Sequence, residues 1–275
     1  MKKTLITLCI ILTGCICFGQ SPISVTGLTC EKLVNPLAID NTVPHFSWMI
    51  HSDRTGASSA AYQVVVATSP EKLDEKNADL WNSGKVPGSE SLSVRYEGKP
   101  LASKTFAYWK VRVWDNEGNI SQWSAPASFG IGFLDDKDWA SNAAFIGVPG
   151  NRGKSEVAPL LRKTFTAKED AERYLLHVNS LGYHEAYVNG TAVSDAVLSP
   201  AVSQFGVRTR IVTYDVTSMV HSGENDIIIW TGKGWYQTHN KAVVPGGPYV
   251  RAQLDCITSE GVTAVTATDG SWKYA

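Results

Sequence analysis

The 275-residue chain has 25 basic and 26 acidic residues, a net charge of −1 and 43% hydrophobic residues, as is typical of soluble globular proteins. It has no basic run beyond the lysines at positions 2 and 3, so it lacks the one-sided positive field that a phosphate backbone requires. Nucleic acid is therefore excluded as an expected partner. A chain of this length is expected to form about two domains.

Residues 1–19 are predicted to be a signal peptide. The two lysines precede an apolar run at residues 5–12 that is too short to span a bilayer, and cleavage is favoured before Gln20. An alternative is that LTGC, which ends at Cys15, is a lipoprotein box whose acylated cysteine anchors the protein to a membrane. Either reading predicts export to the periplasm, the outer membrane or the extracellular space.

The five cysteines do not predict a disulfide framework. Three lie in the predicted signal peptide, and the remaining two, Cys30 and Cys256, fall in different predicted domains. Neither has a CxxC partner, so we expect both to be small buried residues rather than a bridge or a metal pair.

Residues 22–131 are predicted to form an antiparallel β-sandwich. The segment at 61–68 is rich in β-branched residues, and residues 107–114 alternate between two faces as a strand requires. The turn cluster DNEGN at 115–119 then returns the chain into an expected strand at 120–129.

This pattern, with Phe46 and Trp48 on an early strand, resembles a fibronectin type III domain. In that family a Tyr usually stands two residues after the Thr that begins the TFAYWKVRVWD strand, and here that position is Ala107. The corner hydrogen bond is therefore expected to be missing unless Tyr108 supplies it.

A linker is predicted at residues 132–142, because acidic residues and a glycine interrupt the strand pattern. Residues 143–275 are predicted to form a second, jelly-roll-like sandwich. Asn189 and Gly190 predict a tight hairpin, and helix is expected only as a turn or so around 216–220. The expected strands lie at 160–165, 173–178, 184–188, 210–216, 226–230, 249–257 and 262–267.

No pair of carboxylates is expected to face across a cleft, as glycoside hydrolysis requires. Asp135, Asp136 and Asp138 are crowded in the linker, and Asp215 is expected to cap the turn that follows it. We therefore predict no catalytic residue in this chain.

The six histidines have no metal-binding spacing, and His177 and His184 are expected to be ordinary strand residues. The sequence also lacks a GxSxG elbow and a nucleotide-binding glycine loop. No metal ligand and no cofactor-binding residue is predicted.

The segment GKGWY at 232–236 is the strongest candidate for ligand contact. Two glycines follow a strand and lead into Trp235 and Tyr236, with Asn240 beyond them, so these three residues are the candidates for carbohydrate contact. We favour the alternative that both rings close the end of the sandwich, because Trp side chains are usually buried.

Short segments spread over the whole chain resemble the start of bacterial α-L-rhamnosidases. In chain order they are LVNPLAID (33–40), HFSW (45–48), AYQVVVATSPEKL (61–73), DLWNSGKV (79–86), YWKVRVWD (108–115), SQWSAP (121–126), LLRKTF (160–165), LGYHEAYVNG (181–190), VLSP (197–200), TYDVT (213–217), GEN (223–225) and GKGWY (232–236).

This resemblance implies an inverting enzyme that removes terminal α-L-rhamnose from glycans with two carboxylates in an (α/α)6 barrel. The barrel would follow the two sandwiches, so we expect the catalytic domain to be missing here and the second sandwich to be truncated at Ala275. Some relatives of the second domain bind L-rhamnose with calcium. The segment at 198–210 (LSPAVSQFGVRTR) departs from the loop expected for that role, so calcium is not predicted.

The sequence is therefore consistent with two alternative functions. The chain is either the accessory N-terminal portion of an exported α-L-rhamnosidase, whose glycan contains L-rhamnose, or a separate extracellular carbohydrate-binding or adhesion module without catalysis. Alone, it is expected to be inactive under both hypotheses. A structural spacer that binds nothing is the third possibility.

Overall fold

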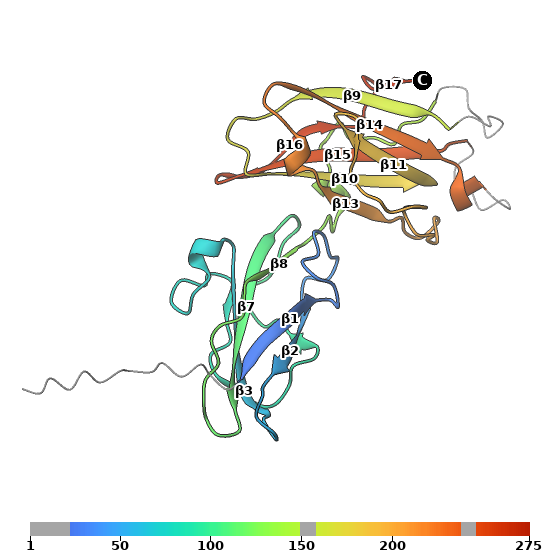
Figure 1. The fold of residues 1–275 in the computed structure, drawn as a ribbon. Coiled ribbons are helices and arrows are strands. Elements are labelled where there is room, and N and C mark those ends of the chain that lie inside the picture. Colours follow the sequence, from blue (N-terminus) through green and yellow to red (C-terminus); the bar gives the residue numbers. More distant parts are fainter. Residues whose placement is uncertain (1–22, 149–157, 238–245) are drawn as a thin grey trace, which may run out of the picture.

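The computed structural model describes residues 23–148, 158–237 and 246–275. The regular secondary structure of these residues is almost entirely β-strand, and the strands form two antiparallel sandwiches, one coloured blue to green and the other yellow to red in Figure 1. The expected all-β class with two sandwiches is confirmed. None of the helical turns in the described ranges has the length and apolarity needed to cross a membrane.

The first sandwich has two sheets with the strand orders β1-β2-β6 and β4-β3-β7-β8, and β5 also pairs with β3. The chain crosses between the two sheets as in fibronectin type III and related sandwiches. The elements are β1 (Ser24–Cys30), β2 (His45–His51), β3 (Ser59–Ala67), η1 (Pro70–Lys72), β4 (Trp81–Asn82), β5 (Val86–Pro87), β6 (Val94–Arg95), β7 (Phe106–Asp115) and β8 (Ala127–Gly130).

Strand β7 shows why this part of the sequence folds as predicted. Every second residue of the strand is buried, and Trp109 is fully enclosed between the two sheets. The ring of Phe46, from β2, lies 4.3 Å from that of Trp109 and 5.6 Å from that of Phe129. Such close aromatic pairs add to the stabilisation from burial alone, so these rings form the centre of the first core.

Tyr108 does not replace the missing corner tyrosine. Its ring lies 5.4 Å from that of Phe106. Another tyrosine makes a hydrogen bond to the backbone in this domain: the Tyr96 hydroxyl donates to the Lys99 carbonyl over 2.8 Å.

The strand expected at 120–129 is wrong in extent, because β8 begins only at Ala127. Between the turn and β8, Ser121 and Ser124 accept hydrogen bonds from the β7 amides of Val113 and Val111 through their side-chain hydroxyls. These serine hydroxyls thus replace some of the backbone carbonyl acceptors that a regular strand would offer to β7. Serine side chains commonly bond to the backbone in this way outside regular strands.

The predicted linker contains the short turn η2 (Asp136–Asp138). Asp135 accepts from the Lys137 amide, and Asp138 accepts in turn from the Asp135 amide, which forms a capping box. The crowded acids of this segment therefore have the structural role that the sequence predicts.

The second sandwich has sheets with the orders β13-β10-β15-β16 and β12-β11-β14-β9-β17. The first of these sheets faces the first domain (Figure 1). The elements are β9 (Leu160–Thr166), β10 (Arg173–Leu181), β11 (Tyr183–Val188), β12 (Thr191–Ala192), β13 (Ile211–Asp215), η3 (Thr217–Met219), β14 (Glu224–Gly232), η4 (Gly234–Gln237), β15 (Tyr249–Thr258), β16 (Gly261–Ala267) and β17 (Lys273–Tyr274).

Local signals in this domain are confirmed. Asn189 and Gly190 both have positive φ, at 50° and 77°, and they connect β11 to β12 as a tight hairpin. Asp215 accepts hydrogen bonds from the amide and hydroxyl of Thr217 at the start of η3. Cys256 of this domain and Cys30 of the first domain are both buried and unbridged, as expected.

Candidate functional site at the domain junction

The GKGWY segment separates its two aromatic rings. Trp235 is 50% exposed, whereas Tyr236 is fully buried, and Asn240 lies outside the described residues. The segment leads into the turn η4 rather than directly into an irregular loop. Gly234 has a φ of 49°, and a Cβ at this position would lie 3.1 Å from the ring of Tyr183, so the turn requires glycine.

Tyr236 anchors the loop that joins β12 to β13. Its ring meets that of Phe205 edge to face, with the centroids 5.3 Å apart. This burial matches the alternative in which the ring closes the end of the sandwich. Carbohydrate contact through Trp235, Tyr236 and Asn240 stays a prediction.

A groove of about 720 Å³ lies between the two domains. One wall is the β1–β2 connection of the first domain, around residues 36–40. The other wall is the segment of the second domain that leads into β13, and Phe133 lines the groove between them. Pockets of this volume are large enough for a small ligand or a short stretch of polymer.

The wall from the first domain is held by backbone hydrogen bonds to β8 and the residues after it. The Gly130 amide donates to the Pro36 carbonyl, the Ile39 amide donates to the Gly130 carbonyl, and the Gly132 amide donates to the Ile39 carbonyl. A Cβ at Gly130 would lie 2.1 Å from the Leu37 carbonyl oxygen. Only glycine permits this close approach, so the wall has a defined position.

Glu31, at the rim of this wall, is occupied by its own loop. Its carboxylate accepts from the Asn41 amide group and from the His45 backbone amide. Partial burial alone would raise the pKa of Glu31, but these hydrogen bonds and the neighbouring His45 ring outweigh it and hold the pKa below its usual value.

The wall from the second domain is also anchored at several points. The His184 amide donates to the Ser199 carbonyl, and the Gln204 carbonyl accepts from the amides of Val207 and Arg208. The Ser203 hydroxyl donates to the Arg208 carbonyl. Together with the contact between Phe205 and Tyr236, these bonds position the segment that carries Arg208 and Arg210 along the groove.

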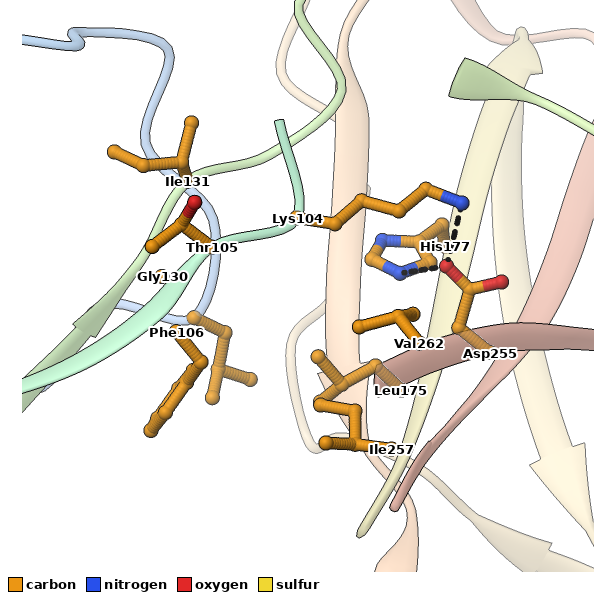
Figure 2. A pocket seen from close by; sticks show the side chains of 11 residues that line it. Lys104, Thr105, Phe106, Gly130, Ile131, Leu175, His177, Asp255, Ile257 and Val262 are labelled. Atoms are coloured by element: carbon orange, nitrogen blue, oxygen red, sulfur yellow. Dashed lines mark ion pairs between the residues drawn. The ribbon is translucent and has the colours of Figure 1, made fainter. Parts of the chain in front are cut away.

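Beside the groove, a buried charge cluster joins the domains. Figure 2 shows Lys104 of the first domain reaching toward Asp255 of β15, with His177 of β10 next to both. The Lys104 Nζ lies 2.9 Å and the His177 Nε2 3.5 Å from Asp255 Oδ2. The Gln253 amide group donates to Asp255 Oδ1 over 2.6 Å.

Asp255 is only 1% exposed. Burial by itself would raise the pKa of Asp255, but His177, Gln253 and Lys104 together outweigh burial and lower it. The ring of Phe133 completes the cluster, because the Lys104 ammonium lies 4.5 Å from its centroid and the His177 ring lies 4.5 Å away. Asp255 Oδ2 has no hydrogen-bond partner among the described residues and is balanced by its ion pairs with Lys104 and His177 alone, and a buried, ion-paired charge of this kind favours one arrangement of the two domains.

Three further contacts around this cluster hold the second domain against the first domain and the linker. The Arg173 guanidinium lies 4.1 Å from the centroid of Phe106, and that of Arg251 lies 4.6 Å from Trp139. Arg251 also pairs with Asp136 of the η2 turn. The His177 and Lys104 contacts were not predicted, because neither residue has a distinctive motif around it.

A second buried polar chain lies within the second domain. The Ser180 Oγ is 2.7 Å from the His184 Nδ1, and the His184 Nε2 is 2.9 Å from the Tyr214 hydroxyl. All three residues are buried, and burial lowers the pKa of His184 to about 4. The hydrogen bonds tie β10, β11 and β13 together, which agrees with the structural role predicted for His184.

The described residues show no cluster of three or more His, Cys, Asp or Glu side chains that could hold a metal ion. The acidic side chains of the junction and of the capped turns have structural partners. Asp226 adds another case, since it pairs with Arg162 over 2.8 Å between neighbouring strands.

Two family models match the chain. One is described as the Rha78A-like, N-terminal immunoglobulin domain and matches residues 25–135, and the other is the Alpha-L-rhamnosidase N-terminal domain and matches residues 169–275. The chain carries N-terminal domains of the α-L-rhamnosidase family. The resemblance inferred from the sequence motifs is therefore confirmed.

Curated relatives support the same assignment. An alpha-L-rhamnosidase of Formosa agariphila is 32% identical over 306 residues, which cover 99% of this chain and 32% of the relative. One from Alteromonas sp. is 30% identical, over 88% of this chain and 28% of the relative. The chain thus spans about a third of the length of these α-L-rhamnosidases.

Solved structures agree with the fold. The alpha-L-rhamnosidase from Dictyoglumus thermophilum superimposes with a TM-score of 0.81 at 29% identity, over 92% of this chain and 29% of that one. The enzyme from Aspergillus terreus superimposes with a TM-score of 0.76 at 23% identity, over the same shares of the two chains, and supports the fold alone.

Proposed function

We propose that this chain is the N-terminal accessory portion of an exported α-L-rhamnosidase that hydrolyses terminal α-L-rhamnose from glycans. The observation that carries this proposal is the alignment of 99% of the chain with 32% of a protein named alpha-L-rhamnosidase. In this proposal the catalytic residues belong to a domain outside residues 1–275. Export is supported by the signal-like pattern of residues 1–19.

In this proposal the two domains form a rigid accessory unit beside the catalytic domain. The buried contact of Lys104 with Asp255 and the stacked arginines at the junction support a fixed orientation. Asp135 and Asp138 form a capping box and Asp215 accepts from Thr217 beside η3, and these bonds within the chain leave the three acids poorly suited to attack a glycosidic bond.

The proposal predicts a native product much larger than the chain itself. An immunoblot of source cells, with antibody against residues 23–131, is expected to show a band several-fold larger than 29.9 kDa. The purified 275-residue chain is expected to release no aryl alcohol from an aryl α-L-rhamnoside. A native band at 29.9 kDa or below, or turnover by the purified chain, would contradict the proposal.

A separate carbohydrate-binding module is the second candidate. The half-exposed Trp235 ring and the groove between the domains favour it, because exposed aromatic rings and open grooves are typical of glycan-binding surfaces. A native band near 29.9 kDa together with retention on a rhamnose-containing glycan would support this candidate over the first.

A further inference from the structure

We propose that the groove between the two domains binds an acidic polysaccharide, with Arg208 and Arg210 holding the anionic groups of its sugars. This inference deepens the proposed function, because it names a glycan class for an accessory surface. It rests on that function only in taking the ligand to be a glycan.

The first observation is that two arginines line the same wall of the groove. Arg208 and Arg210 are two residues apart and both are exposed, and neither guanidinium group has an ion pair or a hydrogen bond to another described residue. In the same domain, Arg162, Arg173 and Arg251 each have an acidic partner. The groove wall therefore carries two positive charges that no described residue neutralises.

Guanidinium groups bind planar or tetrahedral oxyanions through paired N–H donors. The acidic groups of polysaccharides are of these two kinds, because uronic acids carry carboxylates and sulfated sugars carry sulfate esters. Both present the same recognition chemistry to Arg208 and Arg210.

The opposite wall favours a ligand that carries hydroxyl groups as well as anionic groups. Asp40 lines that wall and is exposed, and Glu31 lies at its rim. Carboxylates are hydrogen-bond acceptors only, so Asp40 accepts from hydroxyl groups and disfavours an anionic group on its own side of the groove. An acidic sugar chain supplies anionic groups for the arginine wall and hydroxyl donors for Asp40.

The groove is also held in place before any ligand arrives. The arginine wall is tied to the second sandwich through Phe205 and Tyr236, and the opposite wall is tied to β8 through Gly130. Lys104 and Asp255 connect the two domains beside it. Preorganised walls reduce the entropic cost of binding, which allows a few polar contacts to give measurable affinity.

The test is affinity electrophoresis of the 275-residue chain in gels that contain polygalacturonate, dextran sulfate or neutral dextran. We expect retardation by at least one of the two acidic polymers and none by neutral dextran. Retardation is expected to weaken as salt is added. Preference for polygalacturonate assigns the anionic group as a carboxylate, and preference for dextran sulfate assigns it as a sulfate ester.

The variants locate the site. Arg208→Ala with Arg210→Ala is expected to raise the dissociation constant by about tenfold for each guanidinium group removed. Arg95→Ala is the matched control, because Arg95 is an exposed arginine on β6 that does not line the groove, and it is expected to leave binding unchanged. Unchanged melting temperatures show that all variants are folded.

Several outcomes would overturn the inference. They are the absence of retardation by both acidic polymers, equal retardation by neutral dextran, or equal weakening of binding in the Arg95 and the double variants. None of these outcomes bears on the native mass or on hydrolysis of an aryl rhamnoside by a longer product, so the proposed function is tested separately.

Discussion

Lys104→Met removes the positive charge at the domain junction while keeping an unbranched side chain of similar length over Phe133. In the wild-type protein the Lys104 Nζ lies 2.9 Å from a carboxylate oxygen of Asp255, a residue that is 1% exposed. The substitution therefore leaves a buried carboxylate without its full positive partner.

The size of the effect follows from this burial. Removing one member of a buried ion pair typically costs about 3–5 kcal/mol, because the other charge stays desolvated. Here the Lys104 side chain is 21% exposed, and Asp255 keeps the Gln253 and His177 contacts. We therefore expect the free energy of unfolding to fall by about 2–3 kcal/mol.

Urea unfolding, followed by the fluorescence of the tryptophans, measures this change in stability. Lys137→Met is the matched control, since the Lys137 side chain is 80% exposed and lies 3.7 Å from Asp135. It is expected to change stability by less than about 0.5 kcal/mol. The double variant Lys104→Met with Asp255→Asn is expected to recover part of the stability, because no unpaired charge remains buried.

The pH dependence gives a second readout. The pKa of Asp255 is lowered in the folded state, so its contribution to stability is present above the unfolded pKa and is lost as the pH falls through the lower, folded pKa. Asp255→Asn is expected to flatten the acid side of the stability curve. A Lys104→Met protein as stable as wild type, or a double variant whose destabilisation equals the sum of the single effects, would refute the reasoning.

Two further predictions concern the interiors of the domains. Burial lowers the pKa of His184 to about 4, so its stabilising contribution is present above the unfolded value of about 6.5 and is lost as the pH falls toward 4. His184→Gln should flatten thermal stability between these pH values, and an unchanged slope would count against the buried neutral ring. Gly130→Ala places a Cβ 2.1 Å from the Leu37 carbonyl oxygen and should destabilise the first domain by about 3 kcal/mol in chemical denaturation. Gly270→Ala, where nothing lies within 4 Å, should be nearly neutral, and equal effects of the two would contradict the argument.

Much of the fold is readable from short stretches of sequence. The alternation at residues 107–114 predicts β7 because side chains of a strand point to opposite faces in turn. Asn189 and Gly190 predict their hairpin because both tolerate positive φ. The strand expected at 120–129 begins only at Ala127, because the hydroxyls of Ser121 and Ser124 bond to β7 before it, which residue periodicity does not reveal.

The candidate site is much less predictable. The GKGWY segment marks a real turn, yet the sequence does not show that Trp235 is half exposed while Tyr236 is buried against Phe205. Arg208 and Arg210 stand in a segment with no motif of its own, and only its position opposite residues 36–40 makes it the wall of a groove.

The sequence by itself determined the all-β class, the local hairpins and caps, and the ordered motifs of an α-L-rhamnosidase N-terminal region, because these depend on neighbouring residues and their periodicity. Only the tertiary structure decided the junction of Lys104 with Asp255 and His177, and the groove beside it. Charge pairing of this kind depends on which distant strands and loops meet in space, and on how far water is excluded where they meet.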